Sequence, residues 1–276
     1  MIGRVSPAIQ KEFELELVSK PDLGQVNRVV DAVYVMTVRS FADRIAHMKS
    51  ELGRHGIDFE FMLEHDADQM APEVVARTFA SGSDISRGAQ SLVLKTLDTW
   101  RLALARGHRR ILILEDDALL DPDFNARFVQ AMEAADKLEP GWLIFLGGHD
   151  TKVPDRFFLT QGPLVELPIA TAEGYVCDAE ALRRRLAWVD EHKIDLALDL
   201  FMRKLDPMLG TRQYWLTRPL VEQGSVVGLF DSALDGQRKK HSRSFNILRN
   251  RWNKFQRHKL RGFLVRLQAR LGRMPK

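Results

Sequence analysis

Cysteine and long apolar runs are both scarce in this sequence, and each absence excludes a class of protein. Cys177 is the single cysteine among 276 residues, so neither an internal disulfide nor a cysteine-based zinc cage can form. No apolar run approaches the roughly 18 residues that span a bilayer, and residues 1–20 lack the apolar core of a secretory signal. We therefore expect a globular protein of a reducing, cytoplasmic compartment, which the 45% hydrophobic and 28% charged residues also favour.

Acidic residues are absent from residues 236–276, which carry 14 of the 41 lysines and arginines. Residues 1–235 therefore hold all 37 acids against 27 basic residues, a formal charge of −10. The net charge of +4 and the pI of about 9.2 describe neither part. We predict an N-terminal extension (1–28), a main domain (29–235) and a basic amphipathic tail (236–276).

The sequence also lacks a glycine-rich phosphate loop and a dinucleotide-binding fingerprint, which argues against NAD-dependent and P-loop enzymes. What it has is an alternation of β-branched apolar segments with segments of helical spacing. This alternation predicts an α/β fold, a sheet of parallel strands flanked by helices. Residues 72–88 show neither pattern and should form an irregular connection. The expected strands are 29–38, 59–63, 111–114, 142–146, 164–167 and 212–217, and the expected helices are 41–52, 93–104, 121–135, 179–189 and 195–205.

Three consecutive acids, Glu115, Asp116 and Asp117, come directly after the expected strand 111–114. Ligands of open α/β sheets bind beyond the carboxyl ends of the strands, which is where this triplet lies. Because side chains alternate along an extended segment, Glu115 and Asp117 should point to the same side and suit Mg²⁺ or Mn²⁺. The alternative is a solvated turn that caps the next helix. We expect Asp121, which a proline follows, to supply that cap, and we favour the metal site.

Six segments, taken in chain order, carry a resemblance to a known family. An Arg-Ser-x-x-Asp-Arg stretch follows the first strand, the acidic triplet ends a later strand, and a Gly-Tyr pair precedes a helix. The six segments are 35–44, 56–61 with 66–67, 113–120, 171–176, 194–196 and 219–225. Together they resemble glycosyltransferase family 25, the bacterial lipopolysaccharide and lipooligosaccharide transferases, across about residues 30–228. Where the family usually has a Ser-His pair, this sequence has Gln90, Ser91 and Leu92, so that histidine is absent.

The resemblance implies a GT-A-like nucleotide-sugar-binding fold, a divalent cation (Mn²⁺ or Mg²⁺) and an inverting transfer to a cell-envelope glycolipid such as lipopolysaccharide. Galactose is the sugar expected from the family. The residues agree with this chemistry, because a cation bound to carboxylates stabilises the negative charge of a departing nucleoside diphosphate. Glu115 and Asp117 are the predicted metal ligands, and Asp116 is predicted to contact the nucleotide sugar.

An inverting transfer also needs a base that deprotonates the acceptor hydroxyl. Asp195 and Asp199 are four residues apart in an expected helix, so both should face one side of it, and Asp195 lies in a segment that resembles the family. These two residues are the predicted catalytic residues. The alternative, which the sequence leaves open, is a charge at the helix N-terminus and a solvent-facing aspartate.

Three further residues are predicted to bind the nucleotide sugar, and two the acceptor. Thr37, Arg39 and Arg44 follow the first strand, and arginine suits phosphate because it forms bidentate hydrogen bonds. A surface salt bridge is the alternative for Arg44. Gly174 and Tyr175 are predicted to form a wall of the acceptor pocket, although Tyr175 suits the core equally well.

Cations alternate with bulky apolar residues from residue 238 onward, at steps of three, four and seven. This spacing predicts an amphipathic helix that lies on an anionic membrane surface, at the inner face of the cytoplasmic membrane. A helix packed on the acidic body is the alternative, and the bulky apolar face disfavours a nucleic-acid arm. Two rival functions also stay open: a metal-dependent phosphoryl-transfer or nuclease domain, and a non-catalytic α/β module that its basic tail tethers to membrane or nucleic acid.

Overall fold

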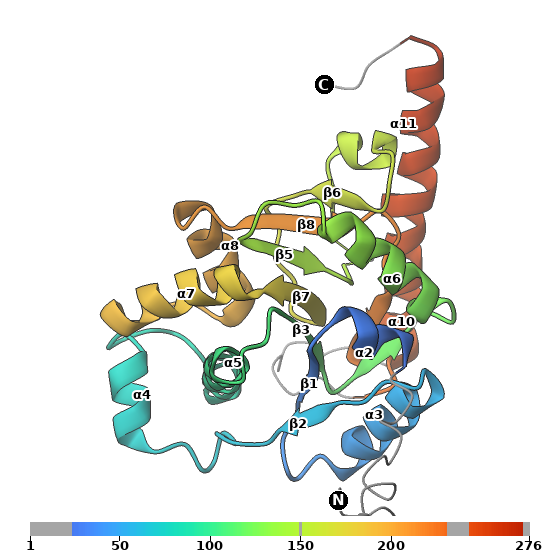
Figure 1. The fold of residues 1–276 in the computed structure, drawn as a ribbon. Coiled ribbons are helices and arrows are strands. Elements are labelled where there is room, and N and C mark those ends of the chain that lie inside the picture. The colour runs from blue at the N-terminus through green and yellow to red at the C-terminus, as the bar shows by residue number, and fades with distance from the viewer. Residues whose placement is uncertain (1–23, 149–150, 231–242, 273–276) are drawn as a thin grey trace, which may run out of the picture.

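The computed structural model describes residues 24–148, 151–230 and 243–272. Most of the predicted N-terminal extension, residues 1–23, and the first part of the predicted tail, residues 236–242, lie outside the described residues. None of the helices within these ranges is both long enough and apolar enough to span a bilayer. Figure 1 shows a central sheet with helices to either side and a long helix along one edge of the molecule.

A seven-stranded sheet forms the centre of the fold, in the order β2-β1-β3-β7-β5-β8-β6. β1, β3, β5 and β8 run in one direction, whereas β7 and the edge strand β6 run in the other. A short 3-10 turn, η1 (Asp155–Leu159), joins β5 to β6, without the crossover helix that a parallel connection needs. The expected parallel sheet is therefore a mixed one. The strands are β1 Ala32–Met36, β2 Glu60–Met62, β3 Arg110–Glu115, β5 Trp142–Phe145, β6 Leu164–Glu166, β7 Gly174–Asp178 and β8 Arg212–Leu216, with β4 Ala118–Leu120 and β9 Val221–Gln223 as a separate antiparallel pair.

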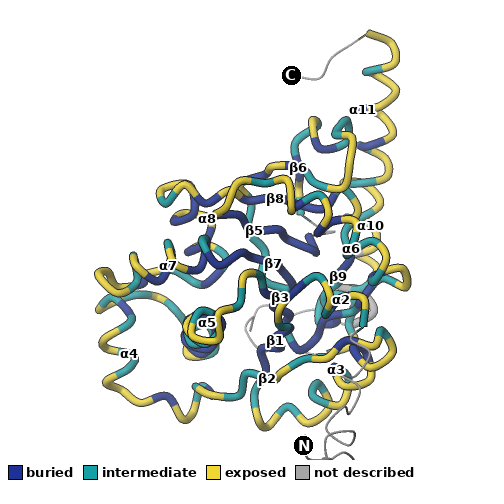
Figure 2. The backbone as a smooth tube through the Cα atoms, in the orientation of Figure 1, coloured by how far each residue is buried: buried dark blue, intermediate teal, exposed yellow. Residues whose placement is uncertain are grey.

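Alternate residues of the central strands face two hydrophobic layers, which confirms the expected α/β class. Ile111 and Ile113 of β3 belong to the layer under α5, α7 and α8, whereas Leu112 and Leu114 belong to the layer under α2, α3 and α6. Both faces of the sheet are thus covered, and the strands are buried between the helices in Figure 2. The helices are α2 Gln25–Val29, α3 Ala42–Arg54, α4 Pro72–Thr78, α5 Arg87–Ala105, α6 Phe124–Ala135, α7 Ala179–Glu191, α8 Leu198–Met208 and α9 Gly224–Val227.

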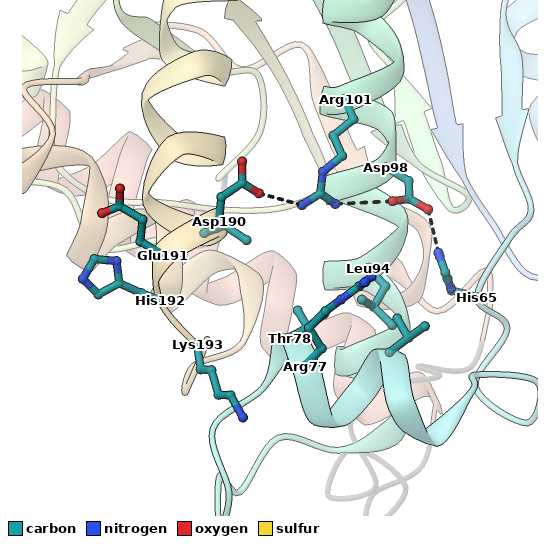
Figure 3. A pocket seen from close by; sticks show the side chains of 12 residues that line it. His65, Arg77, Thr78, Leu94, Asp98, Arg101, Asp190, Glu191, His192 and Lys193 are labelled. Atoms are coloured by element: carbon teal, nitrogen blue, oxygen red, sulfur yellow. Dashed lines mark hydrogen bonds and ion pairs between the residues drawn. The ribbon is translucent and has the colours of Figure 1, made fainter.

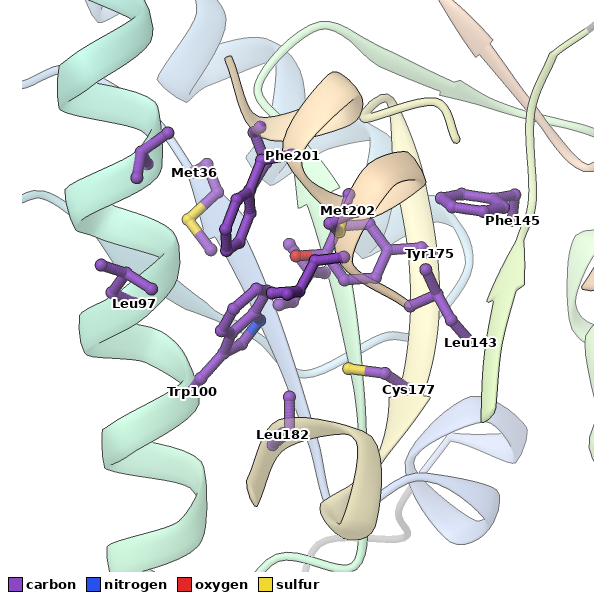
Figure 4. Packing of buried hydrophobic residues seen from close by; sticks show 14 of the residues in the cluster. Met36, Leu97, Trp100, Leu143, Phe145, Tyr175, Cys177, Leu182, Phe201 and Met202 are labelled. Carbon is purple, nitrogen blue, oxygen red and sulfur yellow. The ribbon is translucent and has the colours of Figure 1, made fainter. Parts of the chain in front are cut away.

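The first of these layers holds large aromatic side chains and a buried ion pair between α7 and α8. Trp100 of α5 is fully buried against α8 and the strands (Figure 4). The guanidinium of Arg185 lies 5.2 Å from the centroid of the Trp100 ring. Its Nε and Nη2 each donate to a carboxylate oxygen of Asp206 over 2.7 Å, and both side chains are fully buried. This bidentate pair joins α7 to α8 across the core.

Two connections differ from the expectation. Residues 72–88 are not wholly irregular, because α4 begins at Pro72, where a proline without an N–H suits the first turn. Asp121 does not cap α6, which begins three residues later. Its Oδ1 instead accepts a 2.9 Å hydrogen bond from the N–H of Asp123, since the preceding residues form β4 and pair with β9.

The tail is helical as expected and packs along the body (Figure 1). It consists of α10 (Arg243–Lys254), a π-helical segment η3 (Phe255–Leu260) and α11 (Arg261–Arg270). Gly262 lies against Phe158 so closely that a Cβ there would be 2.8 Å from a ring carbon. The glycine therefore permits close packing of the helix on the body.

Candidate active site

The carboxyl ends of β1, β3, β5 and β8 meet at one edge of the sheet, because these strands run in the same direction. Thr37 follows β1, and the acidic triplet ends β3 and forms the turn after it. β7 runs the opposite way, so its first residue, Gly174, and the preceding Glu173 lie at the same edge. This edge is the position at which open α/β sheets bind their ligands.

Asp116 and Asp117 form a tight turn between β3 and β4, and the chain segment of β9 and α9 closes over it. The Nε2 of Gln223 donates a 2.8 Å hydrogen bond to the Oε2 of Glu115, across 108 residues of sequence. The backbone N–H of Ser225 donates to the Oδ2 of Asp117 over 2.9 Å. The family-like segments 113–120 and 219–225 are therefore parts of one site.

Asp116 is held by protein groups on the side of β1 and α3. It is 6% exposed, and its Oδ2 accepts a 2.8 Å hydrogen bond from the Oγ1 of Thr37. Its Oδ1 forms a 2.5 Å ion pair with Arg44, whose guanidinium lies 5.2 Å from the ring centroids of Phe41 and Phe230. Burial raises the pKa of Asp116, and the Arg44 charge opposes this rise. Thr37, Arg44 and Asp116 thus form one buried cluster beside the other two acids.

Glu115 has the most strongly perturbed carboxyl of the triplet. Burial, followed by the charge of Asp117, raises the pKa of Glu115 to about 8, against an ordinary value of 4.5. The Gln223 hydrogen bond opposes the rise, and the charges of Glu173 and Asp116 add to it. An acid with this pKa binds a proton at neutral pH unless a cation replaces that proton.

Glu173 is a fourth acid at this edge. Its Oε1 accepts a 2.5 Å hydrogen bond from the N–H of Gly148, which follows β5. Gly147 allows this approach, because a Cβ there would come within 2.2 Å of the same oxygen. Glu115 ends β3, and Glu173 directly precedes its antiparallel neighbour β7. The two carboxyl groups lie near enough for their charges to interact.

The carboxylates of Glu115 and Asp117 suit a hard divalent cation. The Oδ1 of Asp117 is buried and has no hydrogen-bond partner within the described ranges, so its lone pairs are available to a ligand. In the part of the chain that the structure describes, no three histidine, cysteine or acidic side chains converge as a complete metal cage. Mg²⁺ typically binds one or two protein carboxylates and takes its remaining ligands from substrate phosphates and water, which two acids satisfy.

The structure places Arg39 and the two predicted catalytic aspartates outside these contacts. Arg39 pairs with Glu64 and donates a 2.6 Å hydrogen bond to the carbonyl oxygen of Leu63. Asp195 is exposed and lies 3.6 Å from the Nζ of Lys204.

The expected helix at 195–205 begins instead at Leu198, so Asp195 and Asp199 do not share a helix face. The reason is tertiary. Ile194 forms a bridge with Phe79, which keeps this part of the chain extended.

The structure also corrects the predicted acceptor wall at Tyr175. This side chain is fully buried in the hydrophobic layer of Figure 4, so it has no surface with which to contact an acceptor. Gly174 is buried beside it and pairs with Leu114 of β3, whose Cδ2 would be 3.0 Å from a Cβ at Gly174. These two residues therefore position β7 within the sheet.

A separate groove of about 720 Å³ lies between α4, α5 and the end of α7 (Figure 3). His65, whose φ is +62°, approaches Asp98 at 2.6 Å, and Arg101 lies 3.6 Å from Asp98 and 3.2 Å from Asp190. Arg101 thus connects α5 to α7 at the groove wall. No residue of the acidic triplet lines this groove.

Sequence reasoning assigned no role to Glu173, Gln223 or Ser225, although all three contribute to the triplet's surroundings. The signal was present, because these residues lie in the family-like segments 171–176 and 219–225. Which atoms they contact depends on the pairing of β4 with β9 and of β3 with β7, and the sequence does not give this pairing.

Comparison with known proteins finds relatives that are named as glycosyltransferases. The chain is similar to the lacto-N-neotetraose biosynthesis glycosyltransferase LgtE of Neisseria gonorrhoeae, with 26% identity over 86% of this chain and 95% of that relative. It is 28% identical to LgtB of Neisseria meningitidis over 52% of this chain and 49% of LgtB. It is also 30% identical to the human "inactive glycosyltransferase 25 family member 3", over 39% of this chain and 17% of that protein.

These similarities confirm the resemblance to glycosyltransferase family 25 and support a glycosyltransferase that is related to lipooligosaccharide biosynthesis enzymes. No protein-family model matches the chain. Among solved structures, a mannose-1-phosphate geranyltransferase of Thermus thermophilus overlaps with a TM-score of 0.37 and 12% identity over 72% of this chain and 77% of that chain. Overlap at this TM-score says nothing about the activity of the present chain.

Proposed function

We propose that this protein is a metal-dependent, inverting glycosyltransferase with a GT-A-like fold. It moves a sugar, galactose by family expectation, from a nucleotide sugar to a cell-envelope glycolipid such as lipopolysaccharide. It acts at the inner face of the cytoplasmic membrane, where such an acceptor is exposed to cytoplasmic donors. The similarity to LgtE over most of both chains supports the reaction class.

The observation that carries the proposal is the cluster of acids at the carboxyl ends of the strands. Burial, followed by the charge of Asp117, raises the pKa of Glu115 to about 8, and the Oδ1 of Asp117 has no hydrogen-bond partner within the described residues. Like charges held together in a partly dry site are stabilised by a cation. An ordinary structural turn needs no such cluster.

The chain's own residues divide the remaining work. Glu115 and Asp117 would hold Mn²⁺ or Mg²⁺, which when bound neutralises charge on the departing diphosphate. Gln223 and the Ser225 N–H orient these two carboxylates. Asp116, fixed by Thr37 and Arg44, keeps the turn in shape.

The nucleotide-sugar contacts proposed for Thr37, Arg39, Arg44 and Asp116 fall into two groups. Thr37 and Arg44 both bind Asp116. We propose that, through this contact, they determine the shape and charge of the donor pocket. Arg39 lies on the segment after β1 and is 43% exposed, so its guanidinium can turn from Glu64 towards a phosphate.

The base that deprotonates the acceptor is assigned to Asp195 or Asp199. Both lie at the start of α8, one in the segment before it and one in its first turn. Asp195→Asn should abolish transfer and leave donor binding near normal if Asp195 is the base. Near wild-type turnover in that variant, combined with loss in Asp199→Asn, would move the role to Asp199.

A panel of nucleotide sugars tests the function directly, and one relative that is named inactive makes this test necessary. Purified protein is incubated with each donor, lipooligosaccharide acceptor, and Mn²⁺ or EDTA. We expect donor consumption with one sugar, dependence on the cation, and a product whose anomeric configuration by NMR is opposite to that of the donor.

Matched variants identify the site in the same assay. Glu115→Gln and Asp117→Asn should each reduce turnover by roughly 10²-fold or more, because each removes a charge that stabilises the transition state. Glu191→Gln, an exposed acid at the separate groove, should retain wild-type turnover. Cation-independent transfer, or full activity of Asp117→Asn, would refute the metal site.

A further inference from the structure

The tail helix has two different sides. Towards the body lie His258, Arg261 and Val265, spaced three and four residues apart so that they form one stripe. The Nε2 of His258 is 3.2 Å from the carbonyl oxygen of Thr151, and Arg261 forms a 2.6 Å ion pair with Asp155. This side fixes the helix to the body.

The tail also contacts the candidate active site. Lys254 of α10 pairs with Glu222 of β9, and Glu222 lies opposite Leu119 of β4, two residues after the acidic turn. α10 further packs against α9, which follows Gln223. The orientation of the tail is therefore fixed relative to the acidic triplet.

The outward side of the tail exposes large apolar residues. On α11 and just beyond it, Phe263, Leu264, Leu267 and Leu271 are 59%, 46%, 42% and 66% exposed. Their helical spacing places them roughly 100–160° around the helix from Val265, which is 3% exposed. The lipid-facing stripe, as we name it here, consists of Leu248, Trp252, Phe255, Leu260, Phe263, Leu264, Leu267 and Leu271.

Cations accompany this stripe and acids do not. Lys259, Arg266 and Arg270 are exposed on the same helix, and residues 236–276 contain no aspartate or glutamate. A face with this composition is complementary to a surface that is apolar inside and negative outside. Two copies joined through the same face would bring like charges together, and nucleic acid offers no burial for eight large apolar side chains.

We infer that the lipid-facing stripe docks this protein on a bilayer that contains anionic phospholipid, with α10 and α11 lying in the interface and the acidic triplet held at a fixed orientation to the lipid surface. The inference deepens the proposed function and rests on it only for the glycolipid acceptor. Docking by a folded helix differs from tethering by a flexible tail, because the body-facing contacts determine how the site is presented.

Vesicle binding by the full chain tests the inference. The protein is sedimented with vesicles of phosphatidylglycerol and phosphatidylcholine, or of phosphatidylcholine alone. We expect strong binding to the anionic vesicles and weak binding to the neutral ones. The triple variant Phe263→Ser, Leu264→Ser, Leu267→Ser should bind roughly tenfold less tightly or worse, because burial of even one such side chain is worth about a factor of ten.

Two further variants separate apolar burial from charge. The pair Leu200→Ser, Met208→Ser removes exposed apolar residues of α8 (47% and 70% exposed) and should leave binding unchanged. The triple variant Lys259→Gln, Arg266→Gln, Arg270→Gln should weaken binding to anionic vesicles roughly fivefold for each charge. Brominated lipid should quench wild-type fluorescence through Trp252, and Trp252→Phe should lose that quenching.

Three results would overturn the inference, and two others would assign the stripe to a different partner. Equal binding to neutral vesicles, unchanged binding by the serine variant, or absence of Trp252 quenching would overturn the inference. A wild-type dimer in light scattering that the serine variant converts to monomer would assign the stripe to a second copy, and displacement of anionic vesicles by RNA would assign it to nucleic acid. Sugar transfer to a water-soluble acceptor is measured separately, so failure to bind lipid is distinguishable from failure of the proposed reaction.

Discussion

Glu115 shows how burial and neighbouring charge change the chemistry of one residue. Its carboxyl has an ordinary pKa of 4.5, which its surroundings raise to about 8. The unfolded chain thus releases this proton near pH 4.5, whereas the folded chain keeps it until about pH 8. Over that window the unfolded state binds fewer protons, so the free energy of unfolding falls as the pH rises.

We predict that Glu115→Gln removes part of this pH dependence. In EDTA, the wild-type melting temperature should fall between pH 5 and pH 8. The variant, whose amide cannot ionise, should show a shallower fall and exceed wild type at pH 8. Circular dichroism melts at each pH measure the difference.

The control for this prediction is the exposed acid Glu191. Glu191→Gln should keep the wild-type slope, since its side chain lies at the separate groove. Identical slopes for wild type and Glu115→Gln would show that the carboxyl is not destabilised in the folded protein.

At the scale of elements, α7, α8 and β8 are connected by one polar cluster inside an apolar layer. Asp206 accepts two hydrogen bonds from Arg185 and a third, of 2.7 Å, from the Nε2 of Gln213 on β8. Burying an ion pair costs desolvation, which the bidentate geometry largely offsets. The cluster fixes the position of α8 on the sheet. It therefore also fixes the position of Asp195, which precedes α8, and of Asp199, which lies in its first turn.

Breaking this cluster from one side should be costly. Asp206→Ala leaves the Arg185 charge buried without its partner and should destabilise the protein by about 3–5 kcal/mol. Replacing both partners, Arg185→Met with Asp206→Leu, should recover most of that loss. Urea denaturation gives the free energies of unfolding.

The control is Arg183→Gln, in a surface pair with Glu180, which should stay within about 0.5 kcal/mol of wild type. A mild effect of Asp206→Ala would show that the cluster contributes little.

At the scale of the whole molecule, opposite charges are separated along the chain and brought together by folding. The basic tail lies on an acidic body through Arg261 with Asp155 and Lys254 with Glu222. The edge of the sheet, the β9 segment and the tail are therefore one connected structure. A ligand that binds at the acids should stabilise the entire fold and not only a loop.

We predict that a nucleoside diphosphate, with uridine diphosphate as the first probe, together with Mn²⁺ raises the melting temperature of the full chain by several degrees. Ligand at about 100 times its Kd adds about 2.7 kcal/mol. Neither component alone should do as much, because the cation needs the diphosphate oxygens to complete its ligands. Thermal shift measurements with each component, alone and together, test this.

The variant Asp117→Asn should lose the combined effect, and Asp190→Asn should keep it. The same shift in Asp117→Asn as in wild type would place the nucleotide elsewhere.

Local pattern predicted most of the fold and one part of the site. Val93, Leu97 and Trp100 at helical spacing identified α5, and the apolar run 111–114 identified β3 together with the acids that follow it. Helix α8 was misplaced at its start because Ile194 is held by Phe79, which is distant in sequence. The prediction for Tyr175 is wrong because its sequence neighbours do not reveal that the face of β7 on which Tyr175 lies is covered by α5 and α8.

Sequence alone determined the α/β class, the acidic triplet at a strand end, the separation of charge and the amphipathic tail, because each is written in residues that are neighbours or a few positions apart. Tertiary structure decided that Gln223 meets Glu115, that Asp116 is bound by Thr37 and Arg44, and which side of the tail faces outward. Burial and Coulomb interactions depend on distances in space, and those distances exist only once the chain has folded.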